Sequence, residues 1–386
     1  MVNKIIHLSE PSFNGNEIKY LKDCINSGYV TSGKFVNKFE NAISKYVGTK
    51  YAVACINATS ALQISLKLAG VNYGDEVIVP SLTFIAPINA IAYNGASPIF
   101  MDSDKFYNLN EKKTIEFIEN KTYYKNNCTY NNKTKKKISA LIIVHIFGNA
   151  VKFDKLYNLC KNRNIEIIED ASESLGTFYN DSYNKKKHVG SKSKLSCISF
   201  NGNKIITSAG GGMIITNKLN LAKKARYLIS QAKDHAVNYI HNAIGYNFRM
   251  SNIHAAIGLA QFEKIDIILE KKRKIREFYI NNINKIPGLN IAETPNYAIN
   301  NNWINVLQVN QNIYKKNKIQ IINKLKRNNI EVRPVWHLNH LQKPYIVSQN
   351  YKIKNALNLY NISICLPSSF NINNNQLAKI VKYLKK

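Results

Sequence analysis

The feature that most constrains the fold is an alternation of short apolar runs with helical stretches in the first two thirds of the chain. Ala140–Ile146 is a continuous apolar run, which is typical of a strand buried on both faces of a sheet. A helical stretch, Phe153–Asn162, follows it and leads into a second buried strand, Ile165–Ile168. Strands that alternate with helices predict an α/β domain with a mainly parallel sheet.

The same reading predicts further strands on both sides of this pair. They are Lys50–Ile56, Glu76–Pro80, Ala96–Met101, Lys194–Phe200 and Gly212–Thr216. Together with the first two, they predict a mainly parallel seven-stranded sheet.

The texture of the sequence changes after about residue 260. A long charged helical stretch from Glu263 to Ile283 is followed by Pro287-Gly288 and by shorter mixed elements. We therefore expect a large α/β domain over 1–260 and a smaller C-terminal α+β domain over 261–386. Residues 104–137 look like an insertion in the large domain, with a helix around Lys112–Glu119 and then a polar loop.

Composition limits the classes of protein that this chain can belong to. Of its 386 residues, 45% are hydrophobic, which is enough for a packed core and excludes disorder for most of the chain. The six cysteines are scattered without a C-x-x-C pair, and no apolar run is long enough for a signal peptide or a membrane helix. We expect a cytoplasmic protein with reduced cysteines and no membrane partner.

The formal net charge of +30 raises the possibility of a polyanion-binding protein. The lysines, however, are spread along the chain among many Asn, Ile and Tyr residues, so we interpret the charge as compositional and expect no nucleic-acid partner. Lys121–Lys137 is the one dense basic tract, and we predict a solvated loop there.

Three features could carry chemistry, although each has a simpler explanation. Asp170 follows a buried strand, where ligands bind in open parallel sheets but where Asp also commonly caps loops. Thr59 and Ser60 begin a helix, whose free N–H groups bind anions and which such residues also simply cap. Lys204 lies between a buried strand and a glycine-rich turn, and a desolvated lysine amine can form a Schiff base.

Taken in order, the three features fit one cofactor. Pyridoxal 5'-phosphate needs helix N–H groups for its phosphate, a carboxylate for its ring nitrogen and a lysine for its aldehyde. Motifs for competing cofactors are missing, since the sequence has neither G-x-x-x-x-G-K-[ST] nor a G-x-G-x-x-G after a strand.

Several segments then resemble one family. They are Gly28-Tyr-Val-Thr-Ser-Gly33, Asn57-Ala-Thr-Ser-Ala61, Gly74-Asp-Glu-Val-Ile-Val-Pro-Ser81, Glu169-Asp-Ala-Ser-Glu-Ser-Leu-Gly176, Ser199-Phe-Asn-Gly-Asn-Lys204 and Gly245-Tyr-Asn-Phe-Arg-Met-Ser-Asn252. In sequence and spacing they resemble the DegT/StrS family of nucleotide-sugar aminotransferases. The resemblance implies the aspartate aminotransferase-like fold type I of pyridoxal phosphate enzymes, and it runs nearly end to end.

The resemblance also implies roles for individual residues. Lys204 would bond to the cofactor aldehyde, and Asp170 would pair with the ring nitrogen. The remaining cofactor contacts would be Thr59, Ser60 and Ser199 at the phosphate, Phe84 stacked on the ring, Glu173 near the ring hydroxyl, and Asn247 at the phosphate across a homodimer interface, with Arg249 as the alternative. One departure from the family is Ala209, in Thr207-Ser-Ala-Gly-Gly-Gly212, where glycine is more usual.

Two features carry a narrower likeness, to UDP-sugar 4-aminotransferases of bacillosamine- and legionaminic acid-type pathways. They are the long insertion at 104–137 and the segment Arg333-Pro-Val-Trp-His-Leu-Asn-His-Leu-Gln-Lys-Pro-Tyr345. This likeness implies that Arg333, Trp336 and His337 contact substrate. We predict no metal, because no carboxylate or cysteine accompanies His337 and His340. For Trp303 and Trp336, we favour packing in the core over a platform for the sugar.

The activity implied is amino transfer from L-glutamate, which becomes 2-oxoglutarate, to C4 of a nucleotide-linked 4-keto-6-deoxy sugar, with UDP-2-acetamido-2,6-dideoxy-4-keto-hexose as the acceptor and surface glycans as the destination. A 3-aminotransferase or a perosamine-type enzyme acting on a GDP- or dTDP-sugar is the nearest alternative. A sugar dehydratase of the same fold would have His in place of Lys204. A non-catalytic polyanion-binding or regulatory protein is the alternative from a different class.

Overall fold

The structure is a computed structural model that describes residues 5–180, 187–235 and 237–385. Its centre is an eight-stranded sheet in the order β1-β11-β10-β7-β6-β2-β3-β16. These strands are β1 (Tyr51–Cys55), β2 (Glu76–Pro80), β3 (Ser97–Met101), β6 (Ile138–Val144), β7 (Glu166–Asp170), β10 (Leu195–Ser199), β11 (Gly212–Thr216) and β16 (Asn350–Tyr351). Only β11 runs antiparallel to its neighbours in this sheet.

Seven of these strands coincide with the seven predicted ones, and the parallel pairings confirm the α/β class. The eighth strand was not predicted. β16 comes from the C-terminal part of the chain and pairs with β3 at Phe100 and Met101. Directly after β3, the buried carboxylate of Asp102 accepts the N–H groups of Asn355 and Ala356 at 3.0 and 2.7 Å. The C-terminal part of the chain is therefore held at the edge of the large sheet on both sides of residue 352. Strand pairing holds it before this residue, and hydrogen bonds to Asp102 hold it after.

Helices cover the sheet and continue beyond it. They are α1 (Glu17–Ser27), α2 (Lys34–Val47), α3 (Ala58–Leu68), α4 (Ala86–Tyr93), α5 (Glu111–Asn120), α6 (Asp154–Asn162), α7 (Leu219–Ile229), α8 (Asn252–Phe262), α9 (Ile265–Ile283), α10 (Gln311–Tyr314), α11 (Lys318–Arg327), α12 (Asn355–Ile362) and α13 (Asn374–Lys385). In the part of the chain that the structure describes, no helix is both long and apolar enough to cross a membrane.

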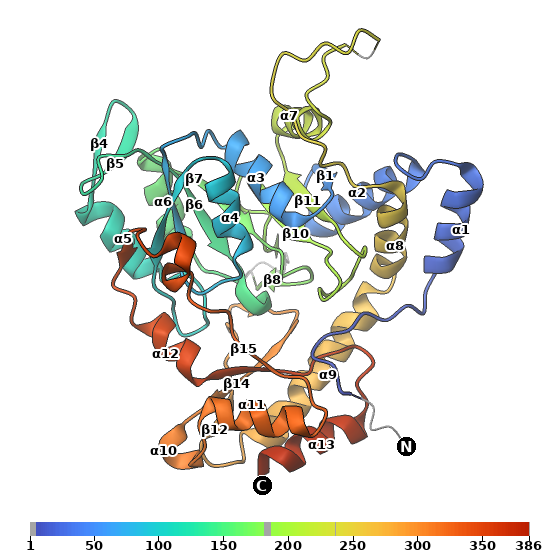
Figure 1. Ribbon diagram of the computed structural model, residues 1–386, viewed down its shortest axis with the longest axis vertical. Helices are drawn as coiled ribbons and strands as arrows, with labels where there is room; N and C mark the ends of the chain where they lie inside the picture. Colours follow the sequence, from blue (N-terminus) through green and yellow to red (C-terminus); the bar gives the residue numbers. More distant parts are fainter. Residues whose placement is uncertain (1–4, 181–186, 236, 386) are drawn as a thin grey trace.

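A second sheet lies in the C-terminal third of the chain. It contains β12 (Leu289–Ile291), β14 (Asn305–Val309), β15 (Arg333–Pro334) and β17 (Ser363–Leu366), all antiparallel. Figure 1 shows this sheet with α11 and α13 below the large sheet, and α9 running from one to the other. Ile265 and Ile268 of α9 belong to the core of the large sheet, whereas Ile275 belongs to the second core. The division at residue 260 stays a prediction.

The polar loop predicted within 121–137 is instead a hairpin of β4 (Thr122–Lys125) and β5 (Cys128–Asn131). Asn126 and Asn127 form its turn, with φ angles of +50° and +57°. Two-residue hairpin turns need this left-handed conformation, and Asn tolerates it. Tyr123 and Tyr130 stack across the strands with ring centroids 5.4 Å apart. A third small sheet joins β8 (Phe178–Tyr179), β9 (Lys187–His188) and β13 (Ala298–Ile299).

A buried carboxylate near the end of β7 fixes the edge of the sheet beside Asp170. Glu169 accepts hydrogen bonds from His145 Nε2 at 3.1 Å, from the N–H groups of Gly190 and Lys192 at 3.0 Å, and from Ser193 N and Oγ at 2.7 and 2.8 Å. His145 Nδ1 accepts from Val151 N, so its proton lies on Nε2. Burial alone would raise the pKa of Glu169, but the hydrogen bonds from His145 and Ser193 lower it to about 2.

We predict that Glu169→Gln lowers the free energy of unfolding by about 3 kcal/mol, because an amide cannot accept from all of these donors. Thermal unfolding at neutral pH measures the change, and Glu166→Gln, on the same strand but paired with Lys194 at the surface, is the matched control. A lowered pKa stabilises the folded state above the unfolded value of 4.5, and this contribution is lost as the pH falls toward 2. The gap between the wild type and Glu169→Gln should therefore narrow from pH 6 to pH 3, and a constant gap would contradict the assignment.

Candidate active site

The carboxyl ends of the parallel strands open into a cavity of about 190 Å³. Asp170 ends β7, Ser199 ends β10, and Asn57 caps α3 directly after β1. Among the described residues, those that line the cavity are Asn57, Ala58, Thr59, Thr83, Phe84, Ala86, Pro87, Val144, Asp170, Ser172, Glu173, Ser199, Asn201, Asn203, Lys204, Gly210, Gly211, Trp303 and Trp336. The structure thus brings together the three features that the sequence placed in separate segments.

Lys204 lies in the turn after β10, and its side chain is only 13% exposed. Its Nζ is 3.6 Å from Oε1 of Glu173 and 4.2 Å from the ring centroid of Trp303. The amine therefore lies between a carboxylate and the face of an aromatic ring.

Two buried carboxyl groups flank this amine. Burial raises the pKa of Asp170, and the hydrogen bonds from Ser172 and the charge of Lys204 oppose the rise. Burial likewise raises the pKa of Glu173, against the charge of Lys204 and a 2.7 Å hydrogen bond from the Phe147 N–H. A cationic ligand atom beside Asp170 would favour its ionised form.

Another wall of the cavity is the N-terminal end of helix α3. The Asn57 side chain accepts only the N–H of Ser60, at 2.8 Å, which leaves the N–H groups of Ala58 and Thr59 for a ligand. The backbone of β11 passes close by, since a Cβ on Gly212 would lie 2.5 Å from the Ala58 nitrogen. Glycine at 212 is therefore required for the strand and the helix end to approach each other.

Ala209, where the family more usually has glycine, adopts a backbone conformation that is unfavourable for a residue with a Cβ. Ala209 has a φ of +66°, in the left-handed region that favours glycine. Its N–H donates to Thr207 Oγ1 at 2.9 Å, which holds the turn in place. The turn keeps its shape although a Cβ is present.

Pyridoxal 5'-phosphate fits the groups present. The free N–H groups at the start of α3 suit its phosphate, the buried Asp170 suits a protonated ring nitrogen, and the Lys204 amine suits its aldehyde. In the described ranges, no group of three or more His, Cys, Asp or Glu side chains is placed to hold a metal ion.

Other predicted residues lie away from the cavity. The side chain of Ser60 is buried, but it does not line the cavity. Arg333 is exposed and donates to Glu331 Oε1 at 3.0 Å, and His337 packs edge-on against Tyr360 with ring centroids 5.3 Å apart. Asn247 is exposed beside Ser230. Their roles stay predictions.

Phe84 and Trp336 both line the cavity, with ring centroids 5.5 Å apart in a T-shaped contact. Trp303, for which packing was the favoured reading, is fully buried and also contacts Lys204. No sequence pattern indicated this contact, because about a hundred residues separate Trp303 from Lys204 along the chain.

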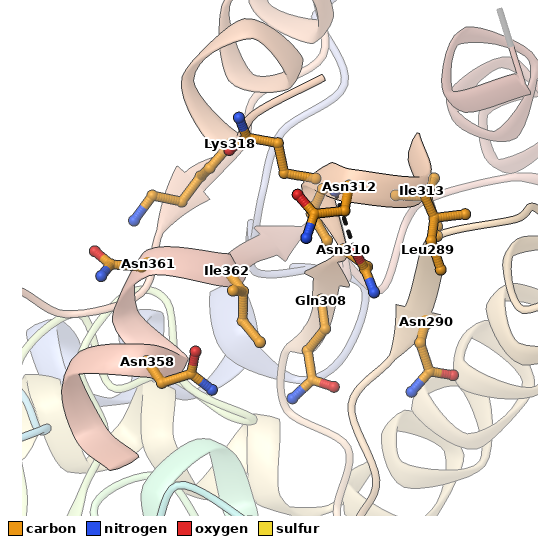
Figure 2. Close-up of a pocket in the computed structure, with 13 residues that line it drawn as sticks. Leu289, Asn290, Gln308, Asn310, Asn312, Ile313, Lys318, Asn358, Asn361 and Ile362 are labelled. Atoms are coloured by element: carbon orange, nitrogen blue, oxygen red, sulfur yellow. Dashed lines mark hydrogen bonds between the residues drawn. The ribbon is translucent and has the colours of Figure 1, made fainter. Parts of the chain in front are cut away.

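A larger hollow, of about 640 Å³, lies in the C-terminal sheet. Figure 2 shows its amide side chains, with Gln308 and Asn290 on neighbouring strands and Asn358 facing them from α12. Among its lining residues the only ionisable side chain is that of Lys318, whose Nζ donates to the Tyr360 carbonyl. Its described lining therefore supplies no acid–base pair, whereas the cavity around Lys204 contains an amine and two carboxyl groups.

Comparison with known proteins agrees with this geometry. The chain is 35% identical to the GDP-perosamine synthase of Escherichia coli O157:H7, over 98% of this chain and 97% of that protein. It is 30% identical to the UDP-4-amino-4,6-dideoxy-N-acetyl-beta-L-altrosamine transaminase of Campylobacter jejuni, over 97% and 95% of the two chains. The structure of Helicobacter pylori PseC, an aminotransferase involved in the biosynthesis of pseudoaminic acid, superposes with a TM-score of 0.87 at 24% identity. The match covers 99% of this chain and 98% of that one.

Residues 11–385 match the DegT/DnrJ/EryC1/StrS aminotransferase family over nearly the whole chain. Members of this family depend on pyridoxal phosphate, and the groups around Lys204 are those that this cofactor needs. The chain thus belongs to the DegT/DnrJ/EryC1/StrS family and is a pyridoxal phosphate-dependent sugar aminotransferase.

Proposed function

We propose that this enzyme moves the amino group of L-glutamate to C4 of a nucleotide-linked 4-keto-6-deoxy sugar. The observation that carries the proposal is the Lys204 amine, held 3.6 Å from Glu173 in the cavity that Asp170 and the start of α3 also line. Two acceptors are candidates. The UDP-linked N-acetyl sugar is the one that the Arg333–Tyr345 segment implies, whereas a GDP-linked sugar is favoured by the higher identity to a GDP-perosamine synthase.

Different residues of the chain hold the cofactor, move the proton and limit the access of water. When bound, pyridoxal phosphate supplies an aldehyde that carries the amino group between substrates and a ring that withdraws electrons. The first N–H groups of α3, with Thr59 and Ser199, hold the phosphate, and Asp170 keeps a proton on the ring nitrogen. With the cofactor bound, Lys204 Nζ would move the proton that amino transfer requires, and Phe84, Trp303 and Trp336 would limit the access of water.

Each active site is proposed to need a second copy of the chain. Asn247 and Arg249 are exposed, and neither lines the cavity of its own chain. In a homodimer with twofold symmetry, this loop would complete the phosphate site of the partner, as the family resemblance implies.

The substrate proposal is tested with 15N-labelled L-glutamate and UDP-, GDP- and dTDP-linked 4-keto-6-deoxy sugars. We expect release of 2-oxoglutarate and 15N at C4 of one nucleotide sugar, read by mass spectrometry and NMR. The nucleotide of the labelled product distinguishes the two candidate acceptors. Label at C3, or 2-oxoglutarate without any labelled sugar, would contradict the proposal.

Substitutions of Lys204 and of Asp170 are expected to impair cofactor attachment and turnover in different ways. Lys204→Ala should bind the cofactor without a covalent bond and lose turnover by about 1000-fold or more, since no amine remains to move the proton. Asp170→Asn should still attach the cofactor to Lys204 while turnover falls by orders of magnitude, because the charge that keeps the ring nitrogen protonated is gone. Borohydride reduction followed by peptide mass analysis locates the attachment.

Lys194→Ala is the matched control, because Lys194 lies at the surface and pairs with Glu166. It should keep normal turnover and cofactor attachment. Normal turnover in Lys204→Ala, or an unchanged rate in Asp170→Asn, would show that these roles are wrong.

A further inference from the structure

One lysine interrupts the buried side of α9. The buried residues of this helix are Ile265, Ile268, Lys272, Ile275, Tyr279 and Ile283, which follow one another three or four positions apart. Such spacing places them on one face of a helix, and this face crosses from the core of the large sheet to the second core. Lys272, only 3% exposed, is the one basic residue on it.

The Lys272 ammonium is held by main-chain oxygens. Its Nζ donates to the carbonyl of Trp303 at 3.1 Å and to the carbonyl of Ser368. Burial lowers the pKa of Lys272 to about 7, and no charged group among the described residues offsets the cost. An apolar side chain of similar volume would avoid this cost, so a buried lysine here calls for a positional explanation.

The two carbonyls belong to neighbouring strand ends. Trp303 precedes β14, Ser368 follows β17, and the strands pair at Asn305 and Leu366. The Asn305 N–H also donates to Ser368 Oγ at 3.2 Å. Lys272 thus joins the start of β14 to the end of β17, the two central strands of the second sheet, beside Trp303.

Trp303 carries this connection into the active site. Its ring face lies 4.2 Å from Lys204 Nζ, and its indole N–H donates to the Asn203 carbonyl, next to Lys204, at 2.6 Å. Its own backbone N–H donates to Asn301 Oδ1 at 3.0 Å. The indole is therefore positioned by its backbone, and one of the two groups that hold this backbone is Lys272.

We propose that Lys272 is a positioning residue that holds the Trp303 indole against the Lys204 amine. Lys272 touches neither the cavity nor Lys204. It acts through the Trp303 carbonyl, and the indole in turn orients the amine and shields it from water. The expected effect on turnover rests on the proposed role of Lys204. The effect of Lys272 on the position of Trp303 does not depend on that role.

Tryptophan fluorescence tests the position without cofactor or substrate. The chain has two tryptophans, so Trp336→Phe leaves Trp303 as the only one. In this background, Lys272→Met should shift the Trp303 emission to longer wavelength and raise the acrylamide quenching constant about twofold, because the indole loses a support and admits solvent. Lys274→Met, an exposed lysine on the same helix that pairs with Glu270, should leave both values unchanged.

Circular dichroism confirms that each variant is folded at the temperature of measurement. If Lys272→Met does not fold, Lys272→Gln, which keeps N–H donors without the charge, is judged by the same criteria. Emission and quenching equal to the parent in a folded Lys272 variant would overturn the proposal.

Kinetics of the holoenzyme, with both tryptophans present, give the second readout. Per folded active site, Lys272→Met should lower kcat about tenfold and leave the KM for L-glutamate within about twofold, because the amine and not the substrate site is disturbed. A purely structural role would lower the unfolding temperature and leave kcat unchanged, which would overturn the proposal. If none of the nucleotide sugars is aminated, the proposed function is wrong. The fluorescence experiment still shows whether Lys272 positions the Trp303 indole.

Discussion

The site depends on two adjacent carboxylates that strand β7 directs to opposite faces of the large sheet. Side chains alternate along a strand, so Glu169 and Asp170 meet different surroundings although they are neighbours. Glu169 meets five hydrogen-bond donors, which lower its pKa and anchor the loop at residues 190–193. Asp170 accepts fewer hydrogen bonds, and burial raises its pKa. A cationic ligand atom beside it would therefore stabilise its ionised form. The hydrogen bonds of Glu169 therefore fix the strand end on which Asp170 lies.

Much of the fold could be predicted because its central strands are buried on both faces and read as apolar runs. This signal located the seven strands of the large sheet that lie between residues 51 and 216, and with them the end of the sheet where ligands bind. Strand β16 has two residues and thus no periodicity to read. The β4–β5 hairpin could have been predicted from Asn126-Asn127 between Tyr-containing segments, but the density of lysines suggested a loop.

The cavity was predicted less completely than the fold. The order of helix start, carboxylate and lysine indicated Thr59, Asp170 and Lys204, because each role needs a distinct residue type. Trp303 was missed as an active-site residue because its contact with Lys204 joins distant segments. Arg333 and His337 were predicted from the likeness of the Arg333–Tyr345 segment to sugar aminotransferases. The Arg333 side chain instead donates to Glu331, and the His337 ring packs against Tyr360, so neither lines the cavity that Trp336 lines.

The way the chain returns to earlier segments has a consequence for its synthesis. Ile6 packs in the core built mainly by residues 275–384, and β16 completes the edge of a sheet whose other strands end at residue 216. Neither core can therefore close while the ribosome is still making the last third of the chain, and the apolar edge at β3 stays open until residue 351 emerges. Nascent chains shorter than this present an unpaired strand to their neighbours, so chaperone demand should peak late in translation.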